Sequence, residues 1–426
     1  MLYLKEANYE DIEKEYIFVK DMPVDENGLT NPWHGISREE FEENALPAMI
    51  AYSKGKQLPE GYVPETFLFL WKDDEIVGQF RIRHYLCESL REGAGHIGYF
   101  VHKDCRGKGY GTEGLRLTLQ VAGTIVPEDE IYLRVNKDNP ASLQVMLHNG
   151  GYICKEDDAK YYVRIKKQTP DEFRNIIRFY EELSINSHPS LQTQYYDGWM
   201  LRFSNGYTNR ANSVNVLYSS VIDLETKVEY CEACYWQQNL PCVFKVTEGS
   251  DKSLDSLLGV KGYQVVTPTD VMSMDLTKKQ FEPDNCIITE EVTQEWLDTY
   301  FSLEHCTKEQ TQATAKQMLT MIQNQTLYCR IVEDGKDIAC ASAVIERGYM
   351  ALLHVIVDEA YRGKGYGRKV CETLLAEAKM RGVHTAYLQV VQKNQIAVHL
   401  YKTLGYQKLY SYWYRVKKEV EFCIEH

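Results

Sequence analysis

The sequence has no long apolar run. No stretch of about 18 consecutive apolar residues occurs, so a membrane-spanning helix and a membrane partner are not expected. The first residues, MLYLKEANYEDIEKEYIF, mix acids and bases with apolar side chains and contain no secretory apolar core. A cytoplasmic location is therefore expected.

Positively charged residues are also fewer than negatively charged ones. Lysine and arginine number 48 against 61 aspartate and glutamate residues, which gives a net charge of −13. Nonspecific nucleic-acid binding depends on basic patches, so a nucleic-acid partner is not expected. An acidic surface is compatible with a cationic substrate such as an amine.

The twelve cysteines form no disulfide or metal framework. Only Cys231 and Cys234 stand close together, in a single CxxC without a second ligand pair. In a cytoplasmic chain most cysteines are reduced and serve as small core residues. No metal is therefore expected, and the pair is interpreted as two thiols one helical turn apart.

One hexapeptide is present twice. RGKGYG occurs at residues 106–111 and again at residues 362–367. Each copy follows an apolar strand-like segment and precedes a segment whose apolar residues recur at helical spacing. Strands that alternate with helices predict an α/β fold, with a mixed central β-sheet flanked by helices.

Three similar endings indicate three related modules. A Gly-Tyr pair follows an apparent helix and opens a strand at residues 151–152, 262–263 and 405–406. Polar, proline-containing breaks follow the first two endings. The middle module has no glycine between Gly206 and Gly249, so it lacks the repeated loop. We therefore predict three domains, which span residues 1–168, 169–280 and 281–426.

The repeated loop is suited to a phosphate. Glycines between a strand and a helix let backbone N–H groups converge, and the helix N-terminus adds a partial positive charge. The alternative is a basic surface turn without a ligand. The Walker pattern fits neither copy. The dinucleotide pattern G-x-G-x-x-G fits the first copy through Gly114, whereas Val370 replaces the third glycine in the second copy.

Beyond the loop, the sequence resembles the GNAT N-acetyltransferases. Arg-x-x-Gly-x-Gly between a strand and a helix is similar to the acetyl-CoA loop of that family. The family pattern continues with Asn, then Ala or Ser three residues later, then a helix that ends in Gly and an aromatic residue. The matching residues are Asn394, Ala397, Tyr401, Gly405 and Tyr406 in the third domain, and Asn139, Ser142, Gly150, Gly151 and Tyr152 in the first.

The resemblance covers the first and third domains nearly end to end, and the middle domain resembles a GNAT half that has lost its loop. It implies a repeated GNAT acyl-CoA N-acyltransferase fold, acetyl-CoA as cosubstrate and a primary amine as acceptor. The pyrophosphate would lie on the loop amides. The pantetheine arm would lie along the preceding strand, where a backbone N–H polarises the thioester carbonyl.

The resemblance also implies a set of cofactor-binding residues in each outer domain. In the first domain they are Tyr99, Phe100, Val101, Arg106, Gly107, Lys108, Gly109, Tyr110, Gly111, Thr112 and Asn139. In the third domain they are Val355, Ile356, Val357, Arg362, Gly363, Lys364, Gly365, Tyr366, Gly367, Arg368 and Asn394.

Tyr401 matches the general acid of the family, which protonates the departing CoA thiolate. The alternative is a buried aromatic side chain on the helix. Met146 takes the matching position in the first domain and cannot give a proton. The residue that would act as the base and deprotonate the amine is less clear. His96 and His354, on the strands before the loops, have a suitable pKa range, although each could be a strand histidine satisfied by its neighbours.

Two other classes of protein fit parts of the pattern. A regulatory protein or pseudo-enzyme could bind acyl-CoA without turnover, and Met146 favours this for the first domain. A nucleotide-dependent enzyme would use residues 109–114, and Val370 counts against it. The middle domain would be a spacer or would help to shape the acceptor cleft of the third. The expected partner is a small-molecule or peptide amine that serves as acceptor. The chain could be a monomer or a homodimer.

Overall fold

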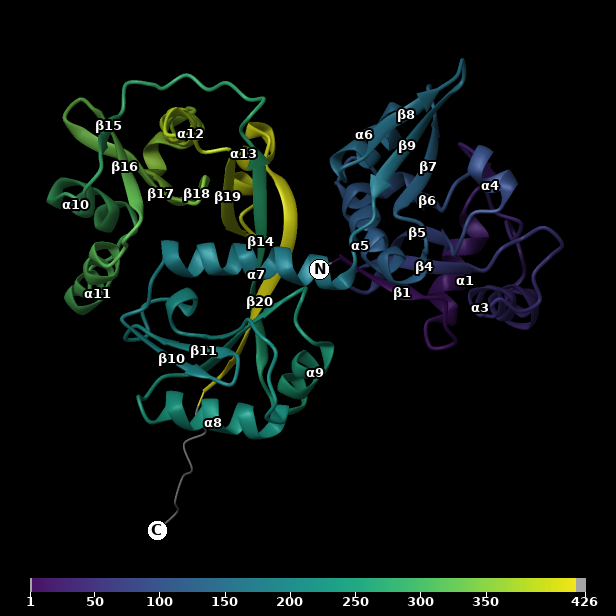
Figure 1. The fold of residues 1–426 in the computed structure, drawn as a ribbon, viewed down its shortest axis with the longest axis horizontal. Helices are drawn as coiled ribbons and strands as arrows, with labels where there is room; N and C mark the ends of the chain where they lie inside the picture. Colours follow the sequence, from purple (N-terminus) through teal and green to yellow (C-terminus); the bar gives the residue numbers. More distant parts are fainter. Residues whose placement is uncertain (1, 419–426) are drawn as a thin grey trace, which may run out of the picture. The chain divides into compact units, whose positions relative to one another are not determined.

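The computed structural model describes residues 2–418, which form two compact units (Figure 1). The first unit is residues 1–173 and the second is residues 174–426. Each unit combines helices with β-sheet, so the predicted α/β class is confirmed. No helix in the described part of the chain is long and apolar enough to cross a membrane.

The first unit contains two main sheets, with strand orders β1-β4-β5-β6 and β7-β9-β8. Their neighbouring strands, β6 and β7, are joined at one end by a hydrogen bond from the His96 N–H to the Tyr132 carbonyl, 2.7 Å long, and form no ladder with each other. The strands are β1 (Leu2–Glu6), β4 (Glu65–Lys72), β5 (Glu75–Arg83), β6 (Ile97–Val101), β7 (Glu130–Asn136), β8 (Tyr152–Glu156) and β9 (Lys160–Lys166), with a small hairpin of β2 (Asp25–Glu26) and β3 (Leu29–Thr30).

Helices cover both faces of the four-stranded sheet in the first unit. Leu68 and Leu70 of β4 pack with α5 on one face, whereas Phe67 and Phe69 pack with α1 and α3 on the other. Burial on both faces explains why the sequence of β4, ETFLFLWK, is almost continuously apolar. The helices are α1 (Ile12–Asp21), α2 (Arg38–Glu40), a π-helical turn (Phe41–Ala45), α3 (Leu46–Ser53), α4 (Glu88–Glu92), α5 (Tyr110–Ile125) and α6 (Pro140–His148).

One sheet of eleven strands runs through the second unit, in the order β10-β11-β12-β13-β20-β14-β19-β18-β17-β16-β15. Only β12 with β13 and β18 with β19 are parallel pairs. The strands are β10 (Gln192–Tyr196), β11 (Trp199–Phe203), β12 (Val214–Val216), β13 (Cys242–Thr247), β14 (Gln264–Asp275), β15 (Ile287–Thr289), β16 (Gln325–Glu333), β17 (Lys336–Glu346), β18 (Tyr349–Val357), β19 (Thr385–Val391) and β20 (Gln407–Lys417).

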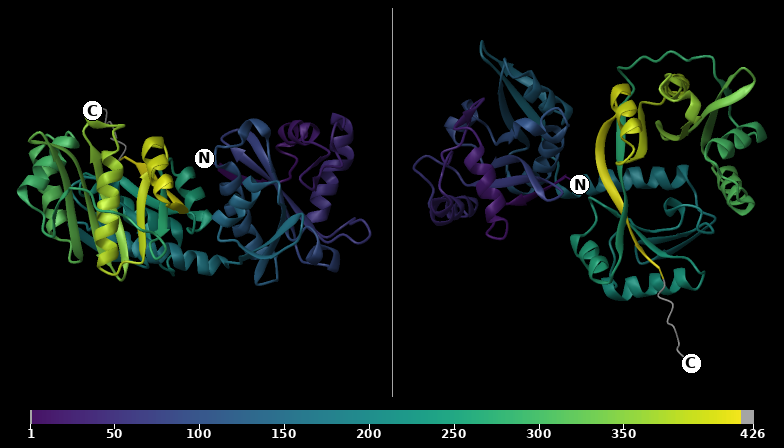
Figure 2. Two further views of the ribbon diagram at one scale, coloured as in Figure 1. Left: turned by 90° about the horizontal axis from the view of Figure 1, so that it is seen from above. Right: turned by 180° about the vertical axis from the view of Figure 1, so that it is seen from behind.

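The long strands β14 and β20 are exchanged between the two halves of this sheet. β20, from the third predicted domain, pairs with β13 of the middle domain, and β14, from the middle domain, pairs with β19 of the third. The two strands also pair with each other, and both views show them side by side (Figures 1 and 2). The predicted boundary near residue 280 therefore does not separate two sheets.

Helices also cover both faces of the second half of this sheet. Cys329 and Ala341 pack with α12 on one face, whereas their neighbours Tyr328 and Cys340 pack with α10 on the other. The period of two along each strand produces this division. The helices of the second unit are α7 (Pro170–Ser187, in which the unit begins), α8 (Leu224–Trp236), α9 (Lys252–Val260), α10 (Gln294–Leu303), α11 (Glu309–Thr320), α12 (Tyr366–Met380) and α13 (Gln395–Leu404).

Candidate active site

The two RGKGYG loops have the same backbone geometry. A 3-10 turn follows β6 and β18, at Lys103–Cys105 and Glu359–Tyr361, and the loop then leads into α5 or α12. The first two glycines of each loop have φ values between 74° and 90°, a region that other residues rarely adopt. Gly109 and Gly365 are the N-cap residues of the two helices. Each loop therefore presents a helix N-terminus at the end of a strand.

Space in front of the loops is compatible with a phosphate group. A Cβ atom built at Gly107, Gly363 or Gly365 would meet no heavy atom within 4 Å. The third glycines are closer to the sheet, because a Cβ at Gly111 or Gly367 would lie 3.7 or 3.6 Å from a methyl group of the preceding strand. Open space before unpaired helix N–H groups fits an anion, so both loops suit the pyrophosphate that the sequence implies.

The loop arginines are attached to their own strands. Arg106 donates from Nε to the Val101 carbonyl at 3.0 Å, and Arg362 donates to the Val357 carbonyl at 3.3 Å. The remaining nitrogens pair with exposed or half-buried glutamates, Glu26 for Arg106 (2.5 Å) and Glu359 for Arg362 (3.1 Å). Both guanidinium groups are about half exposed, so an incoming phosphate could replace these carboxylates.

Other predicted loop residues already have protein contacts. Lys108 donates to the Asp104 carbonyl (2.9 Å), and Lys364 lies 4.6 Å from the centre of the Tyr361 ring. Tyr366 bonds to Glu333, Arg368 pairs with Glu372, and the Thr112 carbonyl accepts a bond from Asn149. Tyr110 packs partly buried against the core of the first unit. Their side chains support the loop, while the backbone amides remain the candidate ligand contacts.

Asn139 and Asn394 are helix N-caps. The Asn139 side chain accepts a bond from the Ser142 N–H, and that of Asn394 accepts one from the Ala397 N–H, both at 3.1 Å. Such caps satisfy an otherwise unpaired helix donor. The structure thus gives these two residues the role of starting α6 and α13, and their predicted contact with the cofactor stays a prediction.

Tyr401 lies on α13 in a buried cluster, and Val355 and Val357 of β18 pack partly buried against that cluster. Burial raises the pKa of the Tyr401 phenol well above its usual value, which keeps the phenol protonated. Among residues 2–418, no protein group hydrogen-bonds to its hydroxyl. In the first unit, Met146 occupies the corresponding position and is buried in the core.

His354 lies at a bulge in β18. The pairing register between β17 and β18 shifts between Cys340 and Ser342, and His354 adopts a positive φ of 53°. Its Nδ1 lies 2.8 Å from the Ser342 hydroxyl. Burial, and then the nearby Arg210 cation, lower the pKa of His354 to about 3. A bulge leaves ladder groups unpaired, so backbone donors become available beside Val355 and Ile356.

The first unit lacks this bulge. β5 and β6 pair without a register shift from Gly78–Val101 to Ile82–Ile97, so Tyr99 and Phe100 lie in a continuous ladder. Gly98, like His354, lies eight residues before the loop arginine, and the side chain of Leu29 approaches it. The two cofactor loops are thus alike, whereas the strands that precede them differ.

His96 occupies a different place from His354. Its Nε2 lies 3.1 Å from Glu128, and its Nδ1 accepts a bond from the Tyr132 N–H at 2.9 Å. Burial lowers the pKa of this fully buried ring. Both ring nitrogens therefore take part in joining β6 to β7, and the catalytic role of His96 stays a prediction.

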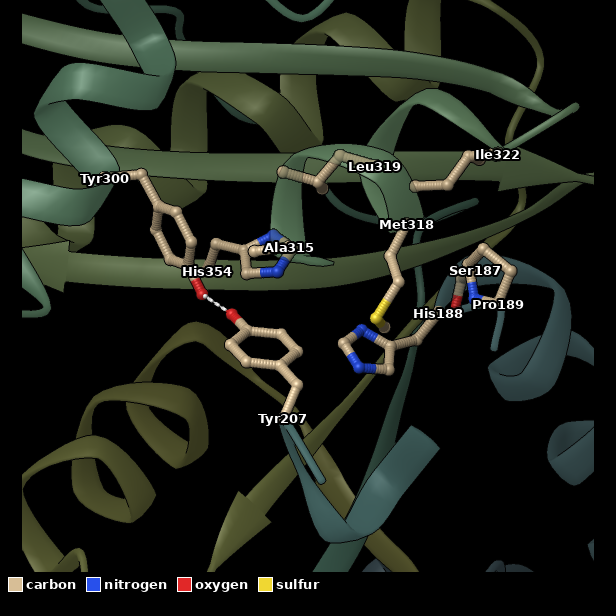
Figure 3. A pocket seen from close by; sticks show the side chains of 10 residues that line it. All are labelled: Ser187, His188, Pro189, Tyr207, Tyr300, Ala315, Met318, Leu319, Ile322 and His354. Carbon is tan, nitrogen blue, oxygen red and sulfur yellow. Dashed lines mark hydrogen bonds between the residues drawn. The ribbon is translucent and has the colours of Figure 1, made fainter. Parts of the chain in front are cut away.

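A small pocket borders His354 in the second unit. Tyr207 and Tyr300 meet there through their hydroxyl groups, 2.9 Å apart, and Met318 points toward His188 (Figure 3). The lining residues are Ser187, His188, Pro189, Tyr207, Tyr300, Ala315, Met318, Leu319, Ile322 and His354. Except for His354, none of these was predicted, because none belongs to the strand, loop and helix motif on which the site residues were assigned.

Matches to two families cover most of the chain. Residues 2–151 match the family described as acetyltransferase (GNAT) domain. Residues 175–415 match the one described as probable histone acetyltransferase Rv0428c C-terminal. The chain belongs to the GNAT acetyltransferases. This membership agrees with the strand–loop–helix geometry of both units and confirms the resemblance on which the site residues were predicted.

Individual GNAT proteins are similar over parts of the chain. The uncharacterized N-acetyltransferase YobR of Bacillus subtilis is 29% identical over 247 residues, which are 57% of this chain and 99% of YobR. The [ribosomal protein bS18]-alanine N-acetyltransferase of Escherichia coli is 33% identical over 82 residues, only 19% of this chain and 55% of that enzyme. A GCN5-related N-acetyltransferase from Kribbella flavida superimposes with a TM-score of 0.44 at 12% identity, over 58% of this chain and 96% of that one.

Proposed function

We propose that the protein transfers the acetyl group of acetyl-CoA to a primary amine, and that the second unit holds the active site. The main support for this proposal is the position of His354. This residue lies on β18 and borders the pocket, and the cofactor loop begins eight residues later at Arg362. An acceptor in the pocket and a thioester along β18 would therefore meet beside the bulge.

Tyr401 and the bulge supply the chemistry that the transfer requires. The amine nitrogen bonds to the acetyl carbon, the carbon–sulfur bond breaks, and the sulfur takes a proton from the Tyr401 phenol. Backbone N–H groups at the bulge would stabilise the negative oxygen of the intermediate. The amine gives up its proton to water.

His354 is suited to orienting the amine. With a pKa lowered to about 3 by burial and by Arg210, its ring is neutral at neutral pH and too weak a base to hold a proton. A neutral imidazole nitrogen can accept a hydrogen bond from an entering amine. The same cationic surroundings disfavour an ammonium group, so they help the acceptor to reach the neutral form that attacks.

The experiment that tests this function is a calorimetric titration of the purified chain with acetyl-CoA, followed by a thiol-release assay with amines. Arg362→Ala should weaken binding to the second unit by about ten- to hundredfold, because a charge-assisted contact is lost. It should also lower thiol release at low acetyl-CoA concentration by about the same factor, whereas Arg106→Ala should not. No binding of acetyl-CoA to the wild-type chain would contradict the proposal.

The first unit has the cofactor loop but lacks a general acid at the position of Tyr401. Its Met146 cannot protonate a thiolate, and β6 has no bulge. We therefore propose that the first unit binds acyl-CoA and does not turn it over. A stoichiometry near two, with wild-type thiol release in Arg106→Ala, is the expected result. Lower thiol release at low acetyl-CoA concentration in Arg106→Ala would show that the first unit is an enzyme.

A further inference from the structure

Trp296 is a buried residue of α10 that takes no part in the transfer chemistry and lies against the bulge in β18. Its backbone N–H donates to the hydroxyl of the N-cap residue Thr293 at 3.2 Å. Its ring stacks on that of Tyr300, with centroids 5.3 Å apart, and meets the ring of Tyr328 edge-on at 4.9 Å. The cap and the two rings together fix the orientation of the indole on the sheet.

The indole N–H of Trp296 donates to two backbone carbonyl groups at once. The acceptors are the carbonyls of Cys329 on β16 and Ala341 on β17, each 3.2 Å from Nε1. Cys329 and Ala341 are direct partners in the ladder between the two strands. A buried indole N–H requires a hydrogen-bond partner, and here both partners belong to the backbone of the sheet.

Ala341 is also the residue that stands opposite the bulge. The register shift between β17 and β18 leaves two residues, His354 and Val355, opposite this single residue. Such a two-to-one arrangement interrupts the ladder and redirects the side chains that follow. Trp296 therefore binds the strand that opposes the bulge, at the residue where the register changes.

The bulge decides which face of the sheet His354 occupies. Before the bulge, Met350 and Leu352 lie in the hydrophobic cluster under α12. After the bulge, Val355 and Val357 pack against the same cluster. The period of two is thus interrupted once, between Leu352 and Val355. An uninterrupted strand would direct His354 into the α12 cluster as well.

His354 instead faces α10, in a strained backbone conformation. Its ring meets those of Trp296 and Tyr300 edge-on, at centroid distances of 5.8 and 5.0 Å. Its φ of 53° is uncommon for a residue other than glycine, and such conformations persist only where the surroundings hold them. The Ser342 hydroxyl, 2.8 Å from Nδ1, holds the ring. Trp296 holds the backbone of the opposite strand.

The first unit lacks both features. Its helix α1 packs on β5 as α10 packs on β17, and α1 contains no tryptophan. β5 and β6 pair without a register shift. The unit with the bulge is therefore the one in which an indole N–H reaches the sheet from this helix.

We propose that Trp296 is a positioning residue, whose indole N–H holds the bulge of β18 in place so that the backbone donors beside it meet the thioester carbonyl and His354 faces the acceptor. The inference rests on the proposed function and adds to it a residue that touches neither substrate. Without the N–H, the bulge is free to shift along the ladder, which changes the face of His354 and the direction of the donors. The cofactor loop lies outside this ladder, so its affinity for the pyrophosphate should not change.

Two replacements of Trp296 remove the N–H. Benzothienylalanine keeps the shape of the indole and has sulfur in place of the N–H, and Trp296→Phe is the genetically encoded variant. Trp199→Phe is the matched control, because Trp199 is equally buried in the same sheet but lies on β11, seven positions from β17 in the strand order. All proteins are full-length and carry Arg106→Ala, so that the second unit is the main cofactor site; the protein with this change alone is the parent.

Hydrogen exchange of the ligand-free proteins, measured by mass spectrometry, tests whether the N–H holds the bulge. Amides of residues 339–357 should exchange about three- to tenfold faster in both Trp296 replacements, while those of β19 keep the parent rate. Trp199→Phe should leave the ratio between the two segments unchanged. An unchanged ratio in the benzothienylalanine protein, which would include equal acceleration of both segments, would overturn the proposal.

Carbon-13 NMR of acetyl-CoA labelled at the carbonyl tests the connection with the reaction. Hydrogen bonds from the bulge should move the carbonyl signal in the parent protein downfield from that of free acetyl-CoA. Both Trp296 replacements should return it toward the free position, with an acetyl-CoA affinity by calorimetry within about twofold of the parent. Trp199→Phe should keep the parent signal. A parent signal in the benzothienylalanine protein would overturn the positioning role.

Two outcomes separate this inference from the proposed function. If the parent protein binds acetyl-CoA and the carbonyl signal equals that of the free molecule, binding stands and the positioning role is overturned. If the parent protein binds no acetyl-CoA, the proposed function fails. The exchange ratio then decides by itself whether Trp296 holds the bulge: a raised ratio supports this and an unchanged one overturns it.

Discussion

The hydroxyl groups of Tyr99 and Ser142 lie 2.7 Å apart and join β6 to α6 in the first unit. In the second unit, Val355 and Ala397 hold the corresponding positions, seven residues before the loop arginine and three after the capping asparagine. Neither side chain can form such a bond. The strand that would hold the pantetheine arm is therefore connected to the following helix in one unit and not in the other.

Removal of this bond should favour ligand binding to the first unit. Tyr99→Phe keeps the ring stacked on Phe80 and deletes only the hydroxyl. If the bond must open before acetyl-CoA enters, its loss should tighten binding about fivefold, which corresponds to about 1 kcal/mol. Calorimetry in an Arg362→Ala background isolates this site. Ser142→Ala should have a smaller effect, because the Tyr99 hydroxyl also donates to the Ser142 carbonyl at 3.2 Å. Unchanged or weaker binding would show that the bond does not restrict the site.

Tyr401→Phe should lower kcat by about a hundredfold and leave KM nearly unchanged, because the phenol acts only when the thiolate leaves. Tyr406→Phe is a matched control, since Tyr406 lies in the same cluster and its buried hydroxyl has no hydrogen-bond partner in the described part of the chain. Steady-state kinetics with saturating acetyl-CoA measures both variants. A normal kcat in Tyr401→Phe would mean that water protonates the thiolate.

The stability of the second unit should fall in mild acid because the folded chain holds His354 in its neutral form. The ordinary histidine pKa is about 6.5 in the unfolded chain, and that of His354 is lowered to about 3, so the unfolded state binds more protons between these values. The stabilisation is complete above pH 6.5 and is lost progressively as the pH falls, by about 2 kcal/mol between pH 6.5 and pH 5.

Urea unfolding at several pH values measures this loss. Comparison with His354→Asn isolates the contribution of this residue from that of other groups, such as His188, whose pKa is also lowered by burial. The variant should show a shallower decrease in unfolding free energy, whatever its stability at pH 7. Parallel pH profiles for the two proteins would rule out the contribution of His354.

The exchanged strands predict which fragments fold. Residues 281–426 alone would lack β14, so β19 would lose its antiparallel neighbour and seven register pairs. We expect this fragment to be insoluble or to unfold without a cooperative transition, whereas residues 174–426 should unfold cooperatively and bind acetyl-CoA. Circular dichroism and calorimetry of both fragments provide the check. A stable 281–426 fragment that binds acetyl-CoA would support the third predicted domain as an independent unit.

The sequence by itself determined the features that depend on neighbouring residues. The repeated RGKGYG predicted two glycine loops between a strand and a helix, and the pattern of Asn139 and Asn394 marked the starts of two helices, which they cap. Apolar spacing predicted α5, α12 and the α/β class. These features are local, because a turn, a cap or an amphipathic helix is specified within a few residues.

Tertiary structure decided the rest. The exchange of β14 and β20 depends on which distant strands pair, and both strands have tyrosine- or β-branched-rich sequences that would fit either place in the sheet. The bulge at His354 depends on the register between β17 and β18. The pocket combines residues 187–207 with residues 300–354. None of these relationships has a period or a motif, so the cofactor loops could be predicted from the sequence and the acceptor pocket could not.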